Sequence, residues 1–517
     1  MKVAATVLAA VILGVAPAAL AQNRTVTVDA GKSTGQIKSL TGVNGGPAPM
    51  REGLPNLVQQ YRQTNIDMVR THDYMGPTDI DARFDPDDPT LAWLVPDPTV
   101  RHQIVAAGNL GSIFPDWSKD PENPASYRFG PTDEAIAAIV ASGAEVYYRI
   151  GRSWAAHNTP PPDFDKFASV VKHVEMHYNQ GWAKGFHDHI RYWEFWNEPE
   201  TFWGGPPAQF FVLYDKTARA LKSAEPSLKV GGPALAVPFT AQPYREDFLD
   251  YCREHKVPLD FYSWHNYTDG SADPLEPARL AKQFRKIIDE HGFPQAESIL
   301  SEYNRSADFT EPMKAELRSA DNAAFVATTL IYLQDASVDR AIYYRGDASW
   351  MGLFDLDKKP YKPAYAIRAM GEMKKTPERI AATGGDDEGF AVLAGKSADG
   401  KTVQILISNY QVPANYKPNV MVPPPEFFVG ATLPDMSKVK LPPNRNITYK
   451  NNAGYDLTIQ NLPWGKKPTL VQINRLSDSD DLAPQPLTVA EGGELRISNA
   501  LPAPGVELIV LREKLNY

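Results

Sequence analysis

The sequence predicts an α/β fold, a (β/α)8 TIM barrel followed by a C-terminal antiparallel β-sandwich domain. Three observations support this prediction. Between residues 36 and 375, short β-branched or aromatic runs alternate with helix-like segments, which is typical of parallel βα units. After residue 376 the pattern changes to alternating runs separated by turn residues. With 517 residues, the chain is also too long for a single ordinary core.

Eight segments have the composition of buried strands, and each precedes a helix-like segment. They are SLTGVNG (39–45), IDMVRTHD (66–73), EVYYRIG (145–151), YWEFWNE (192–198), LKVGGPA (228–234), LDFYSWHNY (259–267), SILSEYN (298–304) and RAIYYRGD (340–347). Segments between them, such as DFDKFASVVKHVEMHYNQGW, have apolar residues at helical spacing and a Pro or Gly near the end. Eight such units favour a closed barrel, with a Pro- and Asp-rich insertion at 74–130.

The second domain is predicted at 376–517. Runs such as TVQILISNY and VELIVLRE alternate apolar and polar residues and are not separated by long helices, which is typical of a β-sandwich. The early segment RTVTVDAGK alternates in the same way, and no helix-like segment follows it. A strand at 22–35 is therefore a candidate member of this second domain.

The first 21 residues have the features of an export signal. Lys2 precedes an apolar stretch at 3–15, and small residues ending in ALA precede Gln22. We expect cleavage after Ala21 and a mature protein in the periplasm or outside the cell. No later stretch approaches about 20 apolar residues, so no association with a membrane is predicted. The formal charge of -9 argues against a nucleic-acid partner, which would require a basic surface.

Polar residues stand where the predicted barrel strands end. In such barrels the loops after the C-terminal ends of the strands build the site, so these residues are the functional candidates. They are Arg70, His72, Asn197, Glu198, His265, Tyr267, Glu302, Asn304, Asp347 and Trp350. Glu198 and Glu302 end strands four and seven, so both can face one ligand. Paired carboxylates among aromatic residues are what glycosidic cleavage requires, because one protonates the leaving oxygen while the other attacks the sugar.

Three motifs in order, WEFWNEP, FYSWHNY and ILSEYN, resemble those of clan A glycoside hydrolases. Within the clan, the sequence is most similar to family 39, the family of β-xylosidases and α-L-iduronidases. The RTH at strand two and KKPYKPAYA after strand eight add to the resemblance, which spans roughly residues 36–372. In one departure, Asp73 follows His72, where the family's xylosidases tend to have Gly. This departure and the following insertion leave the identity of the sugar open.

The resemblance implies a role for each residue that matches the family pattern. Glu198 would be the general acid/base and Glu302 the nucleophile. Asn197 would hold the sugar 2-hydroxyl, and Tyr267 would donate a hydrogen bond that keeps the nucleophile ionised. The residues expected to line the sugar subsite are His265, His72 and Arg70, with Trp350 as its apolar floor.

The implied protein is an exported, retaining glycosidase of exo-acting β-xylosidase type. Its partner would be an oligosaccharide or glycoside, and no metal or organic cofactor is implied. An arabinosidase or an endo-acting polysaccharide hydrolase could use the same machinery. For the acid role, the pKa of Glu198 should lie above about 4.3. Desolvation by Trp196 and Trp203, together with the charge of Glu302, would raise it.

Two other classes of function also match parts of the sequence. His173 and His177 in HVEMH are four residues apart on one helix face and could bind zinc, with Glu175 activating water. The metalloprotease pattern, however, places Glu directly after the first His, where this chain has Val174. A carbohydrate-binding protein without catalysis would also have aromatic residues and a polar rim, but it would need only one of the two carboxylates.

Overall fold

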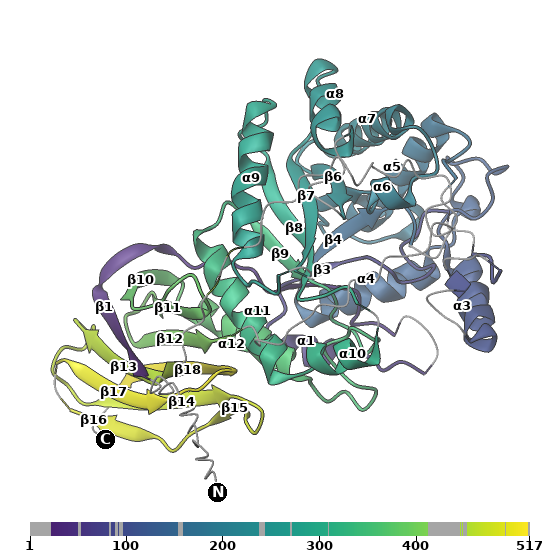
Figure 1. Ribbon diagram of the computed structural model, residues 1–517. Helices are drawn as coiled ribbons and strands as arrows, with labels where there is room; N and C mark the ends of the chain where they lie inside the picture. The colour runs from purple at the N-terminus through teal and green to yellow at the C-terminus, as the bar shows by residue number, and fades with distance from the viewer. Residues whose placement is uncertain are drawn as a thin grey trace, which may run out of the picture.

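The structure is a computed structural model that contains a closed barrel and a curled β-sheet beside it (Figure 1). It describes residues 22–49, 53–81, 84–87, 91–92, 97–153, 159–236, 243–268, 271–308, 310–411, 445, 447, 452–491 and 493–514. The expected signal peptide therefore lies outside the described residues. In the described part of the chain, no helix combines the length and the apolar character needed to cross a bilayer.

The barrel has eight strands, and every neighbouring pair is parallel. They are β2 (Gly42–Asn44), β3 (Met68–Arg70), β4 (Glu145–Ile150), β5 (Tyr192–Phe195), β6 (Lys229–Leu235), β7 (Phe261–Tyr267), β8 (Glu297–Asn304) and β9 (Arg340–Tyr343). Pairing between β2 and β9 closes the circle. Each strand overlaps one of the eight predicted segments, so the barrel prediction is confirmed.

The interior of the barrel changes from apolar to ionic along the strands. Its apolar layer is one buried cluster, made of Met68, Tyr147, Tyr192, Phe261, Ile299 and Ile342. Side chains in a strand alternate between its two faces, so Arg70 and Glu194 follow two residues later on the same inner face. Both are fully buried. The barrel therefore fills its centre with apolar side chains and places charged groups at its C-terminal end.

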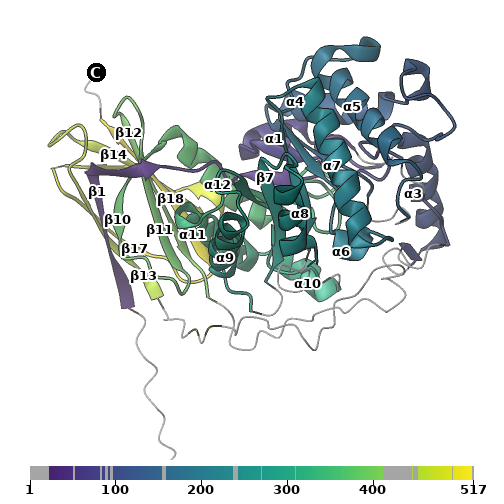
Figure 2. The same cartoon turned by 90° about the horizontal axis from the view of Figure 1, so that it is seen from above.

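Helices surround the barrel (Figures 1 and 2). They are α1 (Val58–Thr64), α3 (Pro98–Gly111), α4 (Gly130–Ser142), α5 (Phe164–Gln180), α6 (Pro199–Phe202), α7 (Pro207–Ala224), α8 (Phe248–Glu254), α9 (Glu276–Glu290), α10 (Glu311–Leu317), α11 (Ala320–Tyr332) and α12 (Lys362–Glu372). The bounds of α5 follow from its caps: the Asp163 side chain accepts from the Lys166 N–H, and Gly181 ends the helix with φ 76°.

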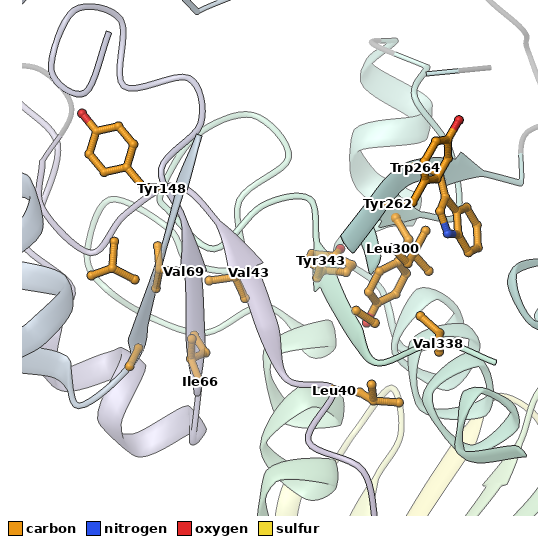
Figure 3. Close-up of a cluster of buried hydrophobic side chains, with 14 of the residues drawn as sticks. Leu40, Val43, Ile66, Val69, Tyr148, Tyr262, Trp264, Leu300, Val338 and Tyr343 are labelled. Carbon is orange, nitrogen blue, oxygen red and sulfur yellow. The ribbon is translucent and has the colours of Figure 1, made fainter. Parts of the chain in front are cut away.

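The outer faces of the strands pack in a large apolar cluster. Val43, Val69, Tyr148 and Leu300 belong to it and come from four different strands (Figure 3). Tyr148 also stacks on Trp193 of the neighbouring strand, with ring centroids 4.7 Å apart. Burial of such side chains is worth roughly 1.5–3 kcal/mol each, so this cluster supplies much of the energy that holds the strand ends in place.

The insertion at 74–130 is anchored to the end of β4 by two buried ion pairs. Asp79 accepts from Arg149 at 2.8 Å, and Asp81 accepts from Arg152 at 2.7 Å. The guanidinium of Arg152 also lies over the ring of Trp196, 5.5 Å from its centroid. The described part of the insertion is therefore attached beside the residues that end β5.

The second part is a single ten-stranded sheet of the order β15-β14-β18-β12-β11-β10-β1-β13-β17, with β16 paired to β14. Its strands are β1 (Gln22–Gln36), β10 (Glu378–Thr383), β11 (Phe390–Lys396), β12 (Thr402–Asn409), β13 (Asn452–Gln460), β14 (Thr469–Leu476), β15 (Asp481–Pro484), β16 (Thr488–Ala490), β17 (Leu495–Ala500) and β18 (Gly505–Glu513). All pairs are antiparallel except β1 with β13.

One apolar core fills the curl of this sheet. Val26 from β1, Ile405 from β12, Leu457 from β13 and Ile509 from β18 all belong to it. The predicted β domain is therefore present, with the two layers of the expected sandwich joined into one continuous sheet. β1 lies between β10 and β13, so the strand at 22–35 is paired in this sheet and not in the barrel.

Candidate active site

Arg70 organises the C-terminal end of the barrel. Its side chain is fully buried, and its nitrogens donate to Glu194 at 2.5 Å, Glu302 at 2.7 Å, Asn197 at 2.7 Å and Asn44 at 3.0 Å. The planar guanidinium thus connects the ends of β2, β5 and β8. Because these donors are used within the protein, Arg70 is placed to orient the carboxylates and the amide. The sequence also placed Arg70 in the lining of the sugar subsite, which stays a prediction.

Glu302 at the end of β8 is held by donors on both oxygens. Oε1 accepts from Arg70 and lies 3.4 Å from Nε2 of His72, while Oε2 accepts from the Tyr267 hydroxyl at 2.7 Å. Burial raises the pKa of Glu302, and the nearby Glu198 raises it further. His265, Arg70 and the Tyr267 hydroxyl lower that pKa. These groups favour the ionised form and oppose the effect of burial.

The backbone turns sharply where β5 ends. Trp196 and Glu198 both have positive φ, 67° and 45°, which is unusual for side chains of this size. The Glu198 N–H donates to the Ala234 carbonyl at 2.9 Å, and α6 begins immediately afterwards at Pro199. Tertiary contacts therefore impose this conformation, which leaves the Glu198 side chain 18% exposed, against 4% for Glu302.

The environment of Glu198 keeps its carboxyl group protonated at neutral pH. Burial raises the pKa of Glu198 to about 8, the charge of Asp73 also raises it, and Arg70 lowers it. Nδ1 of His265 lies 2.9 Å from Oε1 of Glu198. Trp196 is 3% exposed and packs edge-to-face on Trp203, so apolar rings replace water close by. The sequence pattern had not connected Asp73 with this acid.

The two carboxyl groups are close enough to act on one bond. An oxygen of Glu198, an oxygen of Glu302 and a nitrogen of His265 all lie within 4.8 Å of one another. In retaining glycosidases the carboxyl groups are about 5–5.5 Å apart, and in inverting ones about 6.5–9.5 Å apart. The separation of Glu198 and Glu302 is therefore short, as in retaining glycosidases, and below the range of inverting ones.

Two buried histidines border this pair. Among the described residues, Nδ1 of His72 and Nε2 of His265 have no hydrogen-bond partner. Burial lowers the pKa of His265 to about 4 and that of His72 well below its ordinary value. Both rings are therefore neutral at pH 7 and can offer one donor and one acceptor each. Such ring nitrogens suit sugar hydroxyls.

Trp350 lies beside the mouth in a small apolar cluster. The cluster consists of Met313, Leu317 and Met351, with Tyr267, Tyr344 and Trp350 packed against it. The ring is partly exposed, which is compatible with its expected place under a sugar. Asn304 and Asp347 are committed to the protein, because Asn304 donates to the Tyr344 carbonyl at 2.7 Å and Asp347 pairs with Arg345 at 2.7 Å.

Several residues of the site were not among the sequence candidates. Glu194 binds Arg70 and accepts from the Tyr147 hydroxyl at 3.0 Å. Its signal was a charged residue at an inward strand position, two places after Tyr192. The Tyr344 hydroxyl donates to Asp73 at 2.9 Å, and that contact joins residues 271 positions apart, which no local pattern reveals.

The histidine pair of the zinc alternative has other partners. On α5, His177 contacts the Trp182 carbonyl at 2.9 Å and Asp133 at 3.1 Å, and Nδ1 of His173 contacts the Ser169 carbonyl at 2.8 Å. Glu175 accepts from the side chains of Asn179 and Gln180. These contacts stabilise the helix on the outside of the barrel, away from the strand ends.

Comparison with known proteins identifies one family. Residues 134–371 match the model described as Glycosyl hydrolases family 39. A curated beta-xylosidase from Geobacillus stearothermophilus is 33% identical over 213 residues, which cover 37% of this chain and 40% of that protein. The aligned part is thus less than half of the length of this relative.

Solved structures extend the likeness to most of the chain. A glucosidase from Croceicoccus marinus is 33% identical, with a TM-score of 0.81 over 95% of this chain and 100% of that one. A GH39 enzyme from Xanthomonas axonopodis pv. citri has a TM-score of 0.67 at 17% identity, over 96% of this chain and 98% of that one. At that identity, the second match shows the fold alone.

Proposed function

Since this chain belongs to family 39 of the glycosyl hydrolases, we propose that it is a retaining glycoside hydrolase that removes one sugar from the end of a glycan. The observation that carries this proposal is the pair of carboxyl groups with oxygens within 4.8 Å of each other. Their environments differ: the pKa of Glu198 is raised to about 8, and Glu302 accepts from Arg70 and Tyr267. Groups of this kind divide into an acid and a nucleophile.

In the first step, Glu302 attacks the anomeric carbon and Glu198 protonates the leaving oxygen. The glycosidic C–O bond breaks, and an ester bond forms between the sugar and Glu302. Asn197, held by Arg70 at 2.7 Å, is the residue proposed to bind the 2-hydroxyl. Hydrogen bonds to that hydroxyl strengthen as the transition state forms.

In the second step, Glu198 acts as a base. Formation of the ester removes the negative charge of Glu302. The pKa of Glu198 therefore falls, and its ionised form becomes more stable. Glu198 takes a proton from water, the water oxygen attacks the anomeric carbon, and Glu302 leaves as a carboxylate. Two inversions give a product with the configuration of the substrate.

Two neutral sugars are the candidates for the substrate. β-Xylosidase action is the first, because the Geobacillus relative is a beta-xylosidase. Glucosidase action is the second, because the Croceicoccus protein that matches over its full length is a glucosidase. A panel of nitrophenyl glycosides, sorted by sugar and anomer, distinguishes them. Release of nitrophenol from none of the panel would contradict the proposed function.

We also propose that the protein is exported and cleaved after Ala21, on the composition of residues 1–21. Purification from the native host and N-terminal sequencing would test this. A mature chain that begins at Gln22 supports export, and an intact N-terminus contradicts it.

The division of labour between the glutamates is tested by chemical rescue. In Glu198→Ala, a dinitrophenyl glycoside needs little protonation, so the first step survives and the glycosyl-enzyme accumulates. Added azide should then speed turnover and give a glycosyl azide of the same anomeric configuration as the substrate. In Glu302→Ala, azide can enter only from the vacated face and should give the opposite configuration. NMR of the products decides, and exchanged outcomes would show that the two roles are reversed.

A further inference from the structure

Asp73 is a further buried carboxylate at the candidate active site. It follows β3 by three residues, has a left-handed backbone with φ 58°, and is 1% exposed. Its Oδ2 accepts from the Tyr344 hydroxyl at 2.9 Å and lies 3.2 Å from Nε2 of His72. The same His72 nitrogen lies 3.4 Å from Oε1 of Glu302. Asp73 and the proposed nucleophile therefore share one neighbour.

The contacts of Asp73 connect it with the proposed nucleophile and, beyond it, with Asn197. Contacts run from Asn197 to Arg70, from Arg70 to Glu302, and from Glu302 through His72 to Asp73. Asn197 and Asp73 thus reach the nucleophile through different side chains, Asn197 through Arg70 and Asp73 through His72. If Asn197 binds the 2-hydroxyl, Asp73 is placed on the His72 side of Glu302 for another hydroxyl of the ring.

The charges around Asp73 are unfavourable for an anionic sugar. Arg345 is the nearby cation, with Nη1 3.7 Å from Oδ2 of Asp73, but it also binds Asp347 at 2.7 Å. Arg70 is similarly shared between Glu194 and Glu302. Two guanidinium groups are therefore shared among four carboxylates. The carboxylates are those of Asp73, Asp347, Glu194 and Glu302. Asp73 also acts on Glu198, where its charge helps to raise the pKa.

We propose that Asp73 is a specificity-determining residue, which accepts a hydrogen bond from a sugar hydroxyl other than the 2-hydroxyl and selects neutral glycosides over those of uronic acids. An ionised carboxylate is an acceptor only, so it pairs with a hydroxyl and repels a substrate carboxylate. This proposal rests on the proposed function, of which it names the substrate class.

Monodeoxy substrates test the hydrogen bond. The enzyme and Asp73→Asn are compared on nitrophenyl glycosides of the preferred sugar that lack one hydroxyl at a time. One deoxy substrate other than the 2-deoxy one should lower kcat/KM of the wild type by about tenfold or more, as expected for a hydrogen bond to a charged group. The same substrate should cause little further loss in Asp73→Asn. Equal losses in both proteins for every deoxy substrate would overturn the proposal.

A glucuronide and its neutral glucuronamide test whether the charge of Asp73 repels a substrate carboxylate, because the two substrates have nearly the same size. We expect the wild type to favour the amide by about tenfold or more, in kcat/KM or in competitive inhibition, and Asp73→Asn to reduce this preference. Asp79→Asn is the matched control, since Asp79 is a buried carboxylate of the same segment that pairs with Arg149. An unchanged preference in Asp73→Asn, or an equal change in Asp79→Asn, would contradict the proposal.

The pH dependence of kcat/KM provides a readout that a purely structural role would not move. Removal of the Asp73 charge should shift the basic limb to lower pH, because Glu198 then loses its proton more easily. The charged and titratable groups near Glu198 are Asp73, Arg70, His265, Glu302 and Tyr267, and the control substitution leaves all five unchanged. If the panel is hydrolysed and azide rescue behaves as described, but Asp73→Asn affects all substrates equally, only this inference fails.

Discussion

Two buried glutamates, one in each part of the molecule, have opposite surroundings. In the curled sheet, Glu507 of β18 accepts from Arg475 at 2.7 Å, from Asn499 at 2.9 Å and from the Tyr455 hydroxyl. In the barrel, Glu302 also has donors on both oxygens, but its neighbours His72 and His265 each keep a ring nitrogen without a partner. A buried charge alone therefore does not indicate a site. Polar atoms without a hydrogen-bond partner around the buried charge are the better indication of a site, because a ligand can supply the missing hydrogen bonds.

The largest expected effect comes from Glu302→Gln. The variant keeps the shape of the side chain but lacks the nucleophile, so kcat/KM on nitrophenyl glycosides should fall by more than about 10⁴-fold. Circular dichroism should show an unchanged fold. A variant that retained a tenth of the activity would show that Glu302 is not the nucleophile.

Glu507→Gln should have the reverse outcome. It removes the charge that accepts from Arg475, whose side chain is 25% exposed, so the loss should be about 1–3 kcal/mol, as for a buried hydrogen bond that loses one partner. Urea or thermal unfolding should show this loss of stability, while kcat/KM at a temperature where the protein is folded should stay within about twofold. A selective loss of kcat would show that Glu507 contributes to catalysis, which would contradict a purely structural role for this glutamate.

The pH profile of kcat/KM should be bell-shaped, since it requires ionised Glu302 and protonated Glu198. The basic limb should lie near pH 8, because the pKa of Glu198 is about 8, and the acidic limb above 4.5, because the pKa of Glu302 is raised. In Glu198→Gln the basic limb should disappear along with most of the activity. A basic limb that stayed in place at full height would exclude Glu198 as the acid.

The same pKa predicts a smaller effect on stability. The pKa of Glu198 is about 8 in the folded chain and lies near 4.5 in the unfolded one, so the folded state binds the extra proton between these values. The stability from Glu198 is complete below pH 4.5 and is lost as the pH rises through 8, by at most about 1.4 kcal/mol per pH unit. Glu198→Gln should therefore gain in melting temperature, relative to the wild type, from pH 5 to pH 9. A constant difference would contradict the raised pKa.

Chelation should have no effect. The carboxylates of Glu198 and Glu302 with His265 could in principle surround a cation, but the proposed chemistry routes protons through Glu198 and needs no metal. Activity after EDTA treatment and dialysis should equal that of the untreated enzyme. A loss restored by adding zinc would overturn the two-carboxylate mechanism.

The sequence predicted the barrel well because each of its strands combines an apolar run with a helix after it. The strand ends could also be located, since Asn197, Glu198 and Glu302 follow such runs directly. The residues that contact these side chains could not be located in the same way. Glu194 has the pattern of an ordinary strand residue, and its role depends on Arg70, which lies two strands away on β3.

Two further features were beyond the reach of local patterns. Asp73 stood out only as a departure from the family, because its contact with Tyr344 joins distant segments. In the sheet, alternation predicted strands but not their neighbours. Neither the parallel pairing of β1 with β13 nor the continuous hydrogen bonding of all the strands leaves a local signal.

The place of β1 has a consequence for how the chain folds. This strand is synthesised before the barrel, yet its hydrogen-bonding neighbours β10 and β13 come after it, and Asn23 bonds Asp456 across 433 positions. Closing so long a loop is entropically costly and makes assembly slow. β1 therefore has no hydrogen-bonding neighbour until β10 and β13 are available, and the sheet can be completed only after the strands that follow the barrel in sequence have been made.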